Sequence, residues 1–267
     1  MPDSDQNARI ATEAPPLAGD SMKILGWYHP YSWLGKVGVI LPSANTVVEA
    51  EFNRWAPDGL TFHGARTTVA GTPSQKSLND MADGAIRAAG DLGTAECDLV
   101  AYCCTSGSFM VDMKQTKQAM AEAAGCPVLT TADAVLDALN HLGIRRVAMA
   151  TPYMDFITEG EVAWLAGAGY DVASYRGLCM GETVRERRAI NRIPPEVVYR
   201  LAKDVDRPEA EAIFLSCTAM PTLRVIDRLE RDLGKPVFSS NSATFRAVLK
   251  ALRVTAPVEN GGRLLAG

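Results

Sequence analysis

Two halves of this chain repeat one another with a period of roughly 110 residues, and this repeat limits the folds that are possible. The segment "VGVILPSANTVVE" is echoed by "VAMATPYMDFITE", "DLVAYCCTSG" by "AIFLSCTAMP", and "CPVLTTADAVLDALNHLGI" by "KPVFSSNSATFRAVLKALRV". The repeat places Cys104 opposite Cys217, and the three landmarks occur in the same order in each half. The chain is therefore predicted to fold into two similar units.

Short apolar runs alternate with amphipathic segments in each half. Runs such as 36–43, 97–104 and 212–218 are nearly continuous in apolar residues, which is typical of strands covered on both faces. The segments between the runs have helical periodicity, and several end at glycine. This alternation predicts an α/β fold of two pseudo-symmetric, doubly wound lobes with parallel sheets. Ligands bind beyond the carboxyl ends of such strands, so the active site is expected in the cleft between the lobes.

The lobe boundaries follow from the repeat. Residues 36–143 are assigned to an N-terminal lobe and residues 144–240 to a C-terminal lobe, and the last helix, 241–254, is a candidate to pack back on the first lobe. Residues 1–22 are rich in Pro, Ala and acidic groups and show no periodicity, so they are interpreted as a disordered leader.

Composition excludes several classes of function. The net charge is −4, with 27 basic and 31 acidic residues, and no block of one sign could follow a phosphate backbone, so nucleic acid is not expected as a partner. No apolar run approaches the roughly 20 residues that span a bilayer, and the first residues do not resemble a secretion signal, so the expected location is cytoplasmic and without a membrane partner. The six cysteines lack paired CxxC spacing, which favours reduced thiols and no metal site.

Cys104 and Cys217 each end a predicted strand and precede a predicted helix, the second one beginning at Pro221. Helix N-termini lower the pKa of a cysteine, so either thiol is expected to act as a base or a nucleophile. Two thiols facing one small anion suit proton transfer between the two faces of a carbon, and they also suit addition to an activated double bond. The alternative interpretation is that both cysteines are small buried core residues.

Hydroxyl and amide side chains in the same turns are the candidate substrate ligands. Ser43 and Asn45 follow the first strand, and Asn45 could instead cap the next helix. Tyr153 follows the matching strand of the second half and could donate a hydrogen bond to a carboxylate or simply pack against a loop. The hydroxyls accompanying the two cysteines are expected to bind a carboxylate as well, and they belong to Thr105, Ser106 and Thr218.

The motifs "GVILPSANTVVEAEF", "AYCCTSGSF", "ATPYMD" and "FLSCTAMPTLRVIDRLERDLGKPVFSSN" resemble the aspartate/glutamate/hydantoin racemase superfamily. Within it, they resemble the branch of maleate cis-trans isomerases and arylmalonate decarboxylases, from about Gly35 to about Val254. The resemblance implies two pseudo-symmetric α/β lobes and no cofactor. It also implies that Cys104 is the nucleophile, that Cys217 is the acid/base of the second lobe, and that Asn45 and Tyr153 bind the substrate carboxylate.

This chain departs from the branch in places. Decarboxylases of the branch carry Gly where Cys104 stands, which argues against simple decarboxylation. Maleate isomerases carry a second substrate-binding Asn, which Asn191 or Arg187 could replace here.

The leading expectation is a cofactor-independent isomerase that converts a maleate-like cis acid to the trans acid through a covalent Cys104 adduct. An amino-acid racemase, including the ectoine-utilisation type, is the close alternative. An arylmalonate-type decarboxylase and a non-catalytic metabolite-binding protein are less favoured, and a homodimer or higher homo-oligomer stays open.

Overall fold

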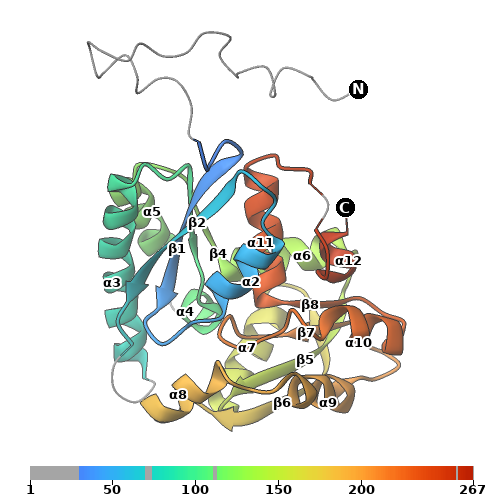
Figure 1. Cartoon of the computed structure of the whole chain (residues 1–267). Coiled ribbons are helices and arrows are strands. Elements are labelled where there is room, and N and C mark those ends of the chain that lie inside the picture. Colours follow the sequence, from blue (N-terminus) through green and yellow to red (C-terminus); the bar gives the residue numbers. More distant parts are fainter. Residues whose placement is uncertain (1–29, 70–73, 111–112, 257, 267) are drawn as a thin grey trace, which may run out of the picture.

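Two four-stranded parallel sheets with the same strand order form the frame of the computed structural model (Figure 1). The structure describes residues 30–69, 74–110, 113–256 and 258–266, so the predicted leader 1–22 lies outside the described residues. The first sheet has the order β2 (Leu60–Thr67), β1 (Gly35–Pro42), β3 (Leu99–Tyr102) and β4 (Val128–Thr130). The second has the order β6 (Asp171–Met180), β5 (Arg146–Tyr153), β7 (Ala212–Leu215) and β8 (Val237–Ser239). The predicted fold of two pseudo-symmetric α/β lobes is confirmed.

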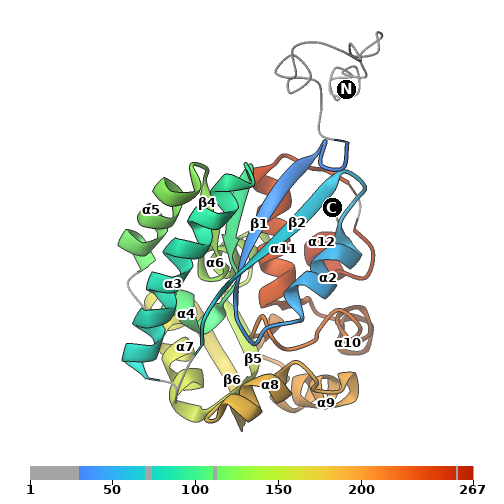
Figure 2. The same ribbon diagram turned by 60° about the vertical axis from the view of Figure 1, so that its left-hand side comes forward.

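Helices cover both faces of each sheet. In Figure 2, α3 and α5 lie on one side of the first sheet, and α2 and α11 lie on the other. Among the described residues, the helices are α2 (Val48–Trp55), α3 (Gln75–Thr94), α4 (Thr105–Phe109), α5 (Met113–Ala124), α6 (Thr131–His141), α7 (Asp155–Gly167), α8 (Val184–Ile190), α9 (Pro195–Val205), α10 (Ile226–Leu233), α11 (Ser240–Ala251) and α12 (Gly262–Leu265). None of the described helices is long and apolar enough to cross a membrane.

Burial explains which strands could be recognised from the sequence. Every residue of β3 and β7 is buried, because helices cover both faces of these central strands. Strand β2 was not predicted: it lies at the edge of its sheet, and its middle residues, around His63 and Gly64, are exposed. An exposed edge strand has no continuous apolar run, so its sequence carries little periodic signal.

The two lobes share one hydrophobic core. A single cluster contains Val39 of β1, Ala150 of β5 and Phe245 of α11. The ring of Phe245 lies 5.4 Å from that of Phe52, and it also contacts Trp55 and Phe62. Helix α11 therefore follows the second sheet in the chain but packs against α2 and α6 of the first lobe. The division at residues 143 and 240 stays a prediction.

We expect Phe245→Ala to lower the free energy of unfolding by about 3–5 kcal/mol, because Phe245 is fully buried and its truncation leaves a cavity among the aromatic rings. Urea denaturation followed by circular dichroism measures this change. The matched control is Phe156→Ala, since Phe156 is 46% exposed and its truncation should cost less than about 0.5 kcal/mol. Equal effects of the two substitutions would show that the shared aromatic cluster does not hold the lobes together.

Candidate active site

Both paired cysteines line one small cavity at the carboxyl ends of the central strands. Cys104 follows β3, Cys217 follows β7, and the cavity between them has a volume of about 120 Å³. Drug-sized ligand sites are usually about 300–1,000 Å³, so this cavity suits only a small molecule. Apolar side chains form much of its wall, namely Val69, Met81, Ile157, Met180 and Ile190.

Cys104 is held as the N-cap residue of the short helix α4. Its sulfur accepts a hydrogen bond from the backbone N–H of Gly107 at 3.3 Å and lies 3.9 Å from the hydroxyl of Ser106. The side chain is buried, and this burial raises the pKa of the thiol. Contacts with the Gly107 N–H and the Ser106 hydroxyl lower the pKa and oppose part of this shift.

Cys217 is held by a turn instead of a helix. Its sulfur accepts from the N–H of Ala219 at 3.3 Å, and its φ of 137° is an uncommon value for a residue with a side chain. Burial raises the pKa of this thiol to about 12, although hydrogen bonds from Tyr153 and Ala219 lower it. The predicted helix at Pro221 is wrong, since α10 begins only at Ile226. The expected lowering of both thiol pKa values by helix N-termini is also wrong, because desolvation outweighs the backbone donors.

Asn45 and Thr218 join the two lobes at the floor of the cavity. The side-chain N–H of Asn45 donates to the Thr218 hydroxyl at 3.1 Å, and that hydroxyl donates to the carbonyl of Cys103 at 3.1 Å. The amide oxygen of Asn45 accepts from the backbone N–H of Val47 at 2.9 Å, so the residue also caps the approach to α2. Asn45 therefore orders the start of α2, and it also lines the cavity, so its role as a substrate ligand stays a prediction.

Of the remaining candidates, Tyr153 and Ser106 line the cavity, whereas Ser43 and Thr105 do not. The hydroxyl of Ser43 accepts from the backbone N–H of Val69, at an exposed position outside the cavity. Thr105 is buried, and its hydroxyl donates to Ser240 at 2.9 Å. The substrate-binding role predicted for Ser43 and Thr105 is therefore not supported by their positions, because each hydroxyl is directed to a structural partner.

Arg187 and Asn191 of the α8 segment both reach the cavity, but their side chains are used differently. The amide oxygen of Asn191 accepts from Thr46 N–H at 2.9 Å, and its N–H donates to the Ala44 carbonyl at 3.0 Å. Asn191 thus fastens the loop that carries Asn45. Arg187 donates to the Gly181 carbonyl at 3.1 Å, and among the described residues it is the one charged side chain that lines the cavity.

A buried carboxyl group behind Cys217 was not recognised in the sequence. Glu161 of α7 is fully buried, and both of its oxygens lie within 2.7 Å of the hydroxyl of Ser216, the residue before Cys217. Burial raises its pKa to about 8, and the Ser216 hydrogen bond opposes that shift. Only the helical spacing of Glu161 from the apolar residues Ile157 and Leu165 could have indicated its burial.

We expect Glu161 to make stability fall with rising pH. Its pKa is 4.5 in an exposed chain and about 8 when folded, so between these values the folded state holds one more proton than the unfolded state. The stability contribution is fully present below pH 4.5 and is lost as pH rises through about 8, at up to about 1.4 kcal/mol per pH unit. Urea denaturation of Glu161→Gln should give a flatter pH profile. The exposed Glu159→Gln is the control and should keep the original slope.

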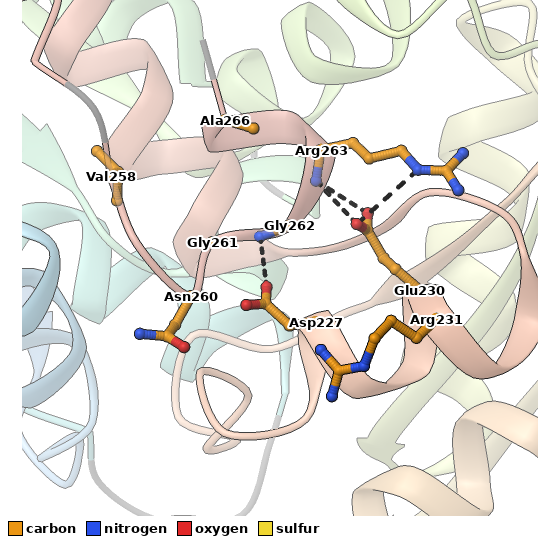
Figure 3. Close-up of a pocket in the computed structure, with 9 residues that line it drawn as sticks. All are labelled: Asp227, Glu230, Arg231, Val258, Asn260, Gly261, Gly262, Arg263 and Ala266. Carbon is orange, nitrogen blue, oxygen red and sulfur yellow. Dashed lines mark hydrogen bonds and ion pairs between the residues drawn. The ribbon is translucent and has the colours of Figure 1, made fainter.

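A second hollow, near the C-terminal end of the described chain, is built from α10 and α12 (Figure 3). Asp227 accepts from the backbone N–H of Gly262 at 2.9 Å, and Glu230 accepts from that of Arg263 at 3.0 Å. These carboxylates therefore fasten the chain end. Within the described residues, no three His, Cys, Asp or Glu side chains are grouped so that they could hold a metal ion.

The sequence of the whole folded region matches a known family. The family model described as arylmalonate decarboxylase matches residues 37–265. The chain belongs to the arylmalonate decarboxylase family. It is 31% identical to arylmalonate decarboxylase of Bordetella bronchiseptica, over 78% of this chain and 87% of the relative. It is 28% identical to maleate isomerase of Geobacillus stearothermophilus, over 87% of this chain and 97% of the relative.

Solved structures agree with these sequence matches. A cysteine-to-serine mutant of Nocardia farcinica maleate cis-trans isomerase, with a covalently bound succinylcysteine intermediate, has a TM-score of 0.79. It is 27% identical, with coverage of 87% of this chain and 98% of that chain. In that neighbouring structure, a succinyl group is bound covalently to a cysteine.

Proposed function

We propose that the protein is a cysteine-dependent isomerase that converts maleate or a closely similar cis dicarboxylate to the trans acid. The observation that carries the proposal is the placement of two thiols, Cys104 and Cys217, on one cavity of about 120 Å³, each with a backbone N–H donating to its sulfur. The similarity to maleate isomerases over nearly the whole folded chain supports the same reaction.

The different surroundings of the two thiols support different roles. The pKa of Cys217 is raised to about 12 by burial, so this thiol keeps its proton and can donate it. Burial also raises the pKa of Cys104, but the Gly107 N–H and the Ser106 hydroxyl offer hydrogen bonds that favour the ionised sulfur. Cys104 is therefore the nucleophile and Cys217 the acid/base.

In the proposed reaction, the Cys104 thiolate forms a bond to one alkene carbon. The electron pair of the double bond moves to the second carbon, which takes the proton of Cys217. Rotation about the resulting single bond brings the two carboxylates apart. Cys217 then takes a proton back, the C–S bond breaks, and its electrons restore Cys104 as a thiolate while the double bond forms again in the trans geometry. Electrons and protons balance, and no cofactor is required in this proposal.

The charge of the cavity favours a dicarboxylate over a diamino acid. Arg187 is a cation at the wall, and a second carboxylate would gain a charge-assisted hydrogen bond from it. An ammonium group at the same place would be repelled. This observation favours the isomerase over a racemase that acts on a diamino acid. The presence of Cys104, where decarboxylases of this branch carry Gly, argues against the decarboxylase.

Proton NMR of the purified protein with maleate tests the proposal directly. In deuterated buffer with EDTA and no added cofactor, the maleate vinyl signal should be replaced by that of the trans acid. Cys104→Ala and Cys217→Ala should each lower turnover by at least about 10³-fold, because the two thiols act as a unit. The control is Cys179→Ala, since this exposed cysteine does not line the cavity. Deuterium at a saturated α-carbon of an amino acid would support the racemase. Binding that survives Cys104→Ser without turnover would support a metabolite-binding protein.

We expect Arg187→Met to raise the KM for maleate by about 10- to 100-fold, because a hydrogen bond to a charged group is worth about 1.5–3 kcal/mol. Steady-state kinetics with maleate and with its monoamide measures this effect, and the monoamide should lose much less. Arg185→Met is the control on the same helix, since Arg185 is exposed and does not line the cavity. A KM for maleate that is the same in both variants would contradict a role of Arg187 in carboxylate binding.

Cytoplasmic location and assembly into a homodimer or higher homo-oligomer complete the proposal. Light scattering after size-exclusion chromatography of the purified protein measures the oligomeric state.

A further inference from the structure

Tyr102 is a buried phenol whose hydroxyl has no hydrogen-bond partner among the described residues. It belongs to β3, two residues before Cys104, and its side chain is fully buried without lining the cavity. A buried polar group without a partner costs about 1–3 kcal/mol. Other tyrosines avoid this cost: the Tyr170 hydroxyl donates to the Leu136 carbonyl, and that of Tyr199 to Asp232. Phe would fill the position of Tyr102 without the penalty, so its hydroxyl calls for an explanation.

The Tyr102 hydroxyl and the Cys104 sulfur border the same gap. A methyl group added at Gly107 would lie 2.7 Å from the Tyr102 oxygen and 2.9 Å from the Cys104 sulfur. The absence of a side chain at Gly107 therefore leaves both atoms beside the same open space. The nearest atom to this point, at 2.5 Å, is the terminal carbon of Met81, which is apolar. Of these three atoms, the sulfur is the acceptor toward which the phenol hydroxyl can turn.

The strength of this contact depends on the charge of the sulfur. A neutral thiol is a weak acceptor, whereas a thiolate accepts a charge-assisted hydrogen bond that is roughly twice as strong as a neutral one. The Gly107 N–H already donates to the sulfur from the helix side. A second donor in a dry environment thus becomes valuable only when Cys104 has lost its proton.

We propose that Tyr102 is a positioning residue whose hydroxyl donates a hydrogen bond to the Cys104 sulfur once that sulfur is ionised. The proposal rests on the proposed role of Cys104 as the nucleophile. In the step itself, the thiol proton leaves for a base or water, the phenol O–H then donates to the negative sulfur, and this hydrogen bond weakens again when the sulfur forms its bond to carbon. The Tyr102 hydroxyl keeps its own proton throughout, because burial raises its pKa well above the ordinary value and the neighbouring Cys104 raises it further.

Other titratable groups also face Cys104 and set the background for the test. Cys103 and Cys217 are neighbouring thiols, Tyr153 is a second phenol, and Arg187 is the charged side chain of the cavity wall. The comparison must therefore keep all of these groups and change only the Tyr102 hydroxyl.

The experiment is the pH dependence of Cys104 alkylation by iodoacetamide, read by mass spectrometry of the Cys104 peptide, in the full chain and in Tyr102→Phe. We expect the substitution to raise the pH midpoint by about one unit, which lowers the alkylation rate at pH 8 by about tenfold. The thermal unfolding temperature should stay the same or rise, because an unpaired buried hydroxyl is removed. Tyr170→Phe is the matched control, and its midpoint should equal that of the unchanged protein.

An unchanged midpoint in Tyr102→Phe overturns the proposal, and so does a lower unfolding temperature without a shift of the midpoint, since that is the signature of a packing role. Gly107→Ala is the second variant. Its methyl group would separate the phenol from the sulfur, so it should raise the midpoint in the same direction while Tyr102 is kept. Because alkylation reads the thiol itself, a raised midpoint in a protein that does not isomerise maleate would leave Tyr102 assigned and overturn only the proposed reaction.

Discussion

The Glu51 carboxylate of α2 is the contact on which the geometry of the second thiol depends. It accepts from the backbone N–H groups of Thr222 and Leu223 at 2.6 and 2.8 Å, and from the side chain of Asn241 at 2.7 Å. Asn241 in turn donates to the carbonyl of Thr218, the residue after Cys217. The loop that carries Cys217 has no helix to order it, so a buried carboxylate of the other lobe supplies the acceptors that its backbone needs. Removing that acceptor would leave several buried donors unpaired.

The two halves share their strand order but not the support of their thiols. In the first half, α4 begins directly after Cys104, whereas in the second half a turn with a φ of 137° presents Cys217. Ser240 joins these different structures, because its hydroxyl accepts from both Thr105 and the backbone N–H of Cys217. The repeat therefore places two equal groups at equal positions, and the unequal loops make one sulfur easier to ionise than the other. An addition reaction needs this inequality, since it requires one thiolate and one thiol at the same time.

The sequence repeat was enough to predict the two sheets, the cleft and both cysteines, because apolar central strands and matched turns leave a clear pattern. It was not enough to predict β2, whose exposed residues lack that pattern. It also did not show that Ser43 and Thr105 lie outside the lining of the cavity. A hydroxyl that follows a strand points to a substrate or to a structural partner according to tertiary packing, and the turn alone does not distinguish these cases. Glu161 contacts Ser216, which lies far along the chain. The Tyr102 hydroxyl borders a space left by the missing side chain of Gly107. Sequence periodicity reports neither relationship.

Burial of both thiols disfavours the thiolate, but it also strengthens the hydrogen bonds that the sulfur accepts. Desolvation raises both pKa values, so little thiolate forms at neutral pH. The same dryness strengthens each fixed donor around the sulfur, since no water competes for it, and these donors do not have to reorganise when charge develops. The backbone N–H of Gly107 serves the sulfur in either charge state, whereas a phenol that has no other partner serves only the anion. A site built in this way favours the ionised sulfur at the moment of attack more than it favours the resting thiol, and that difference is what lowers a reaction barrier.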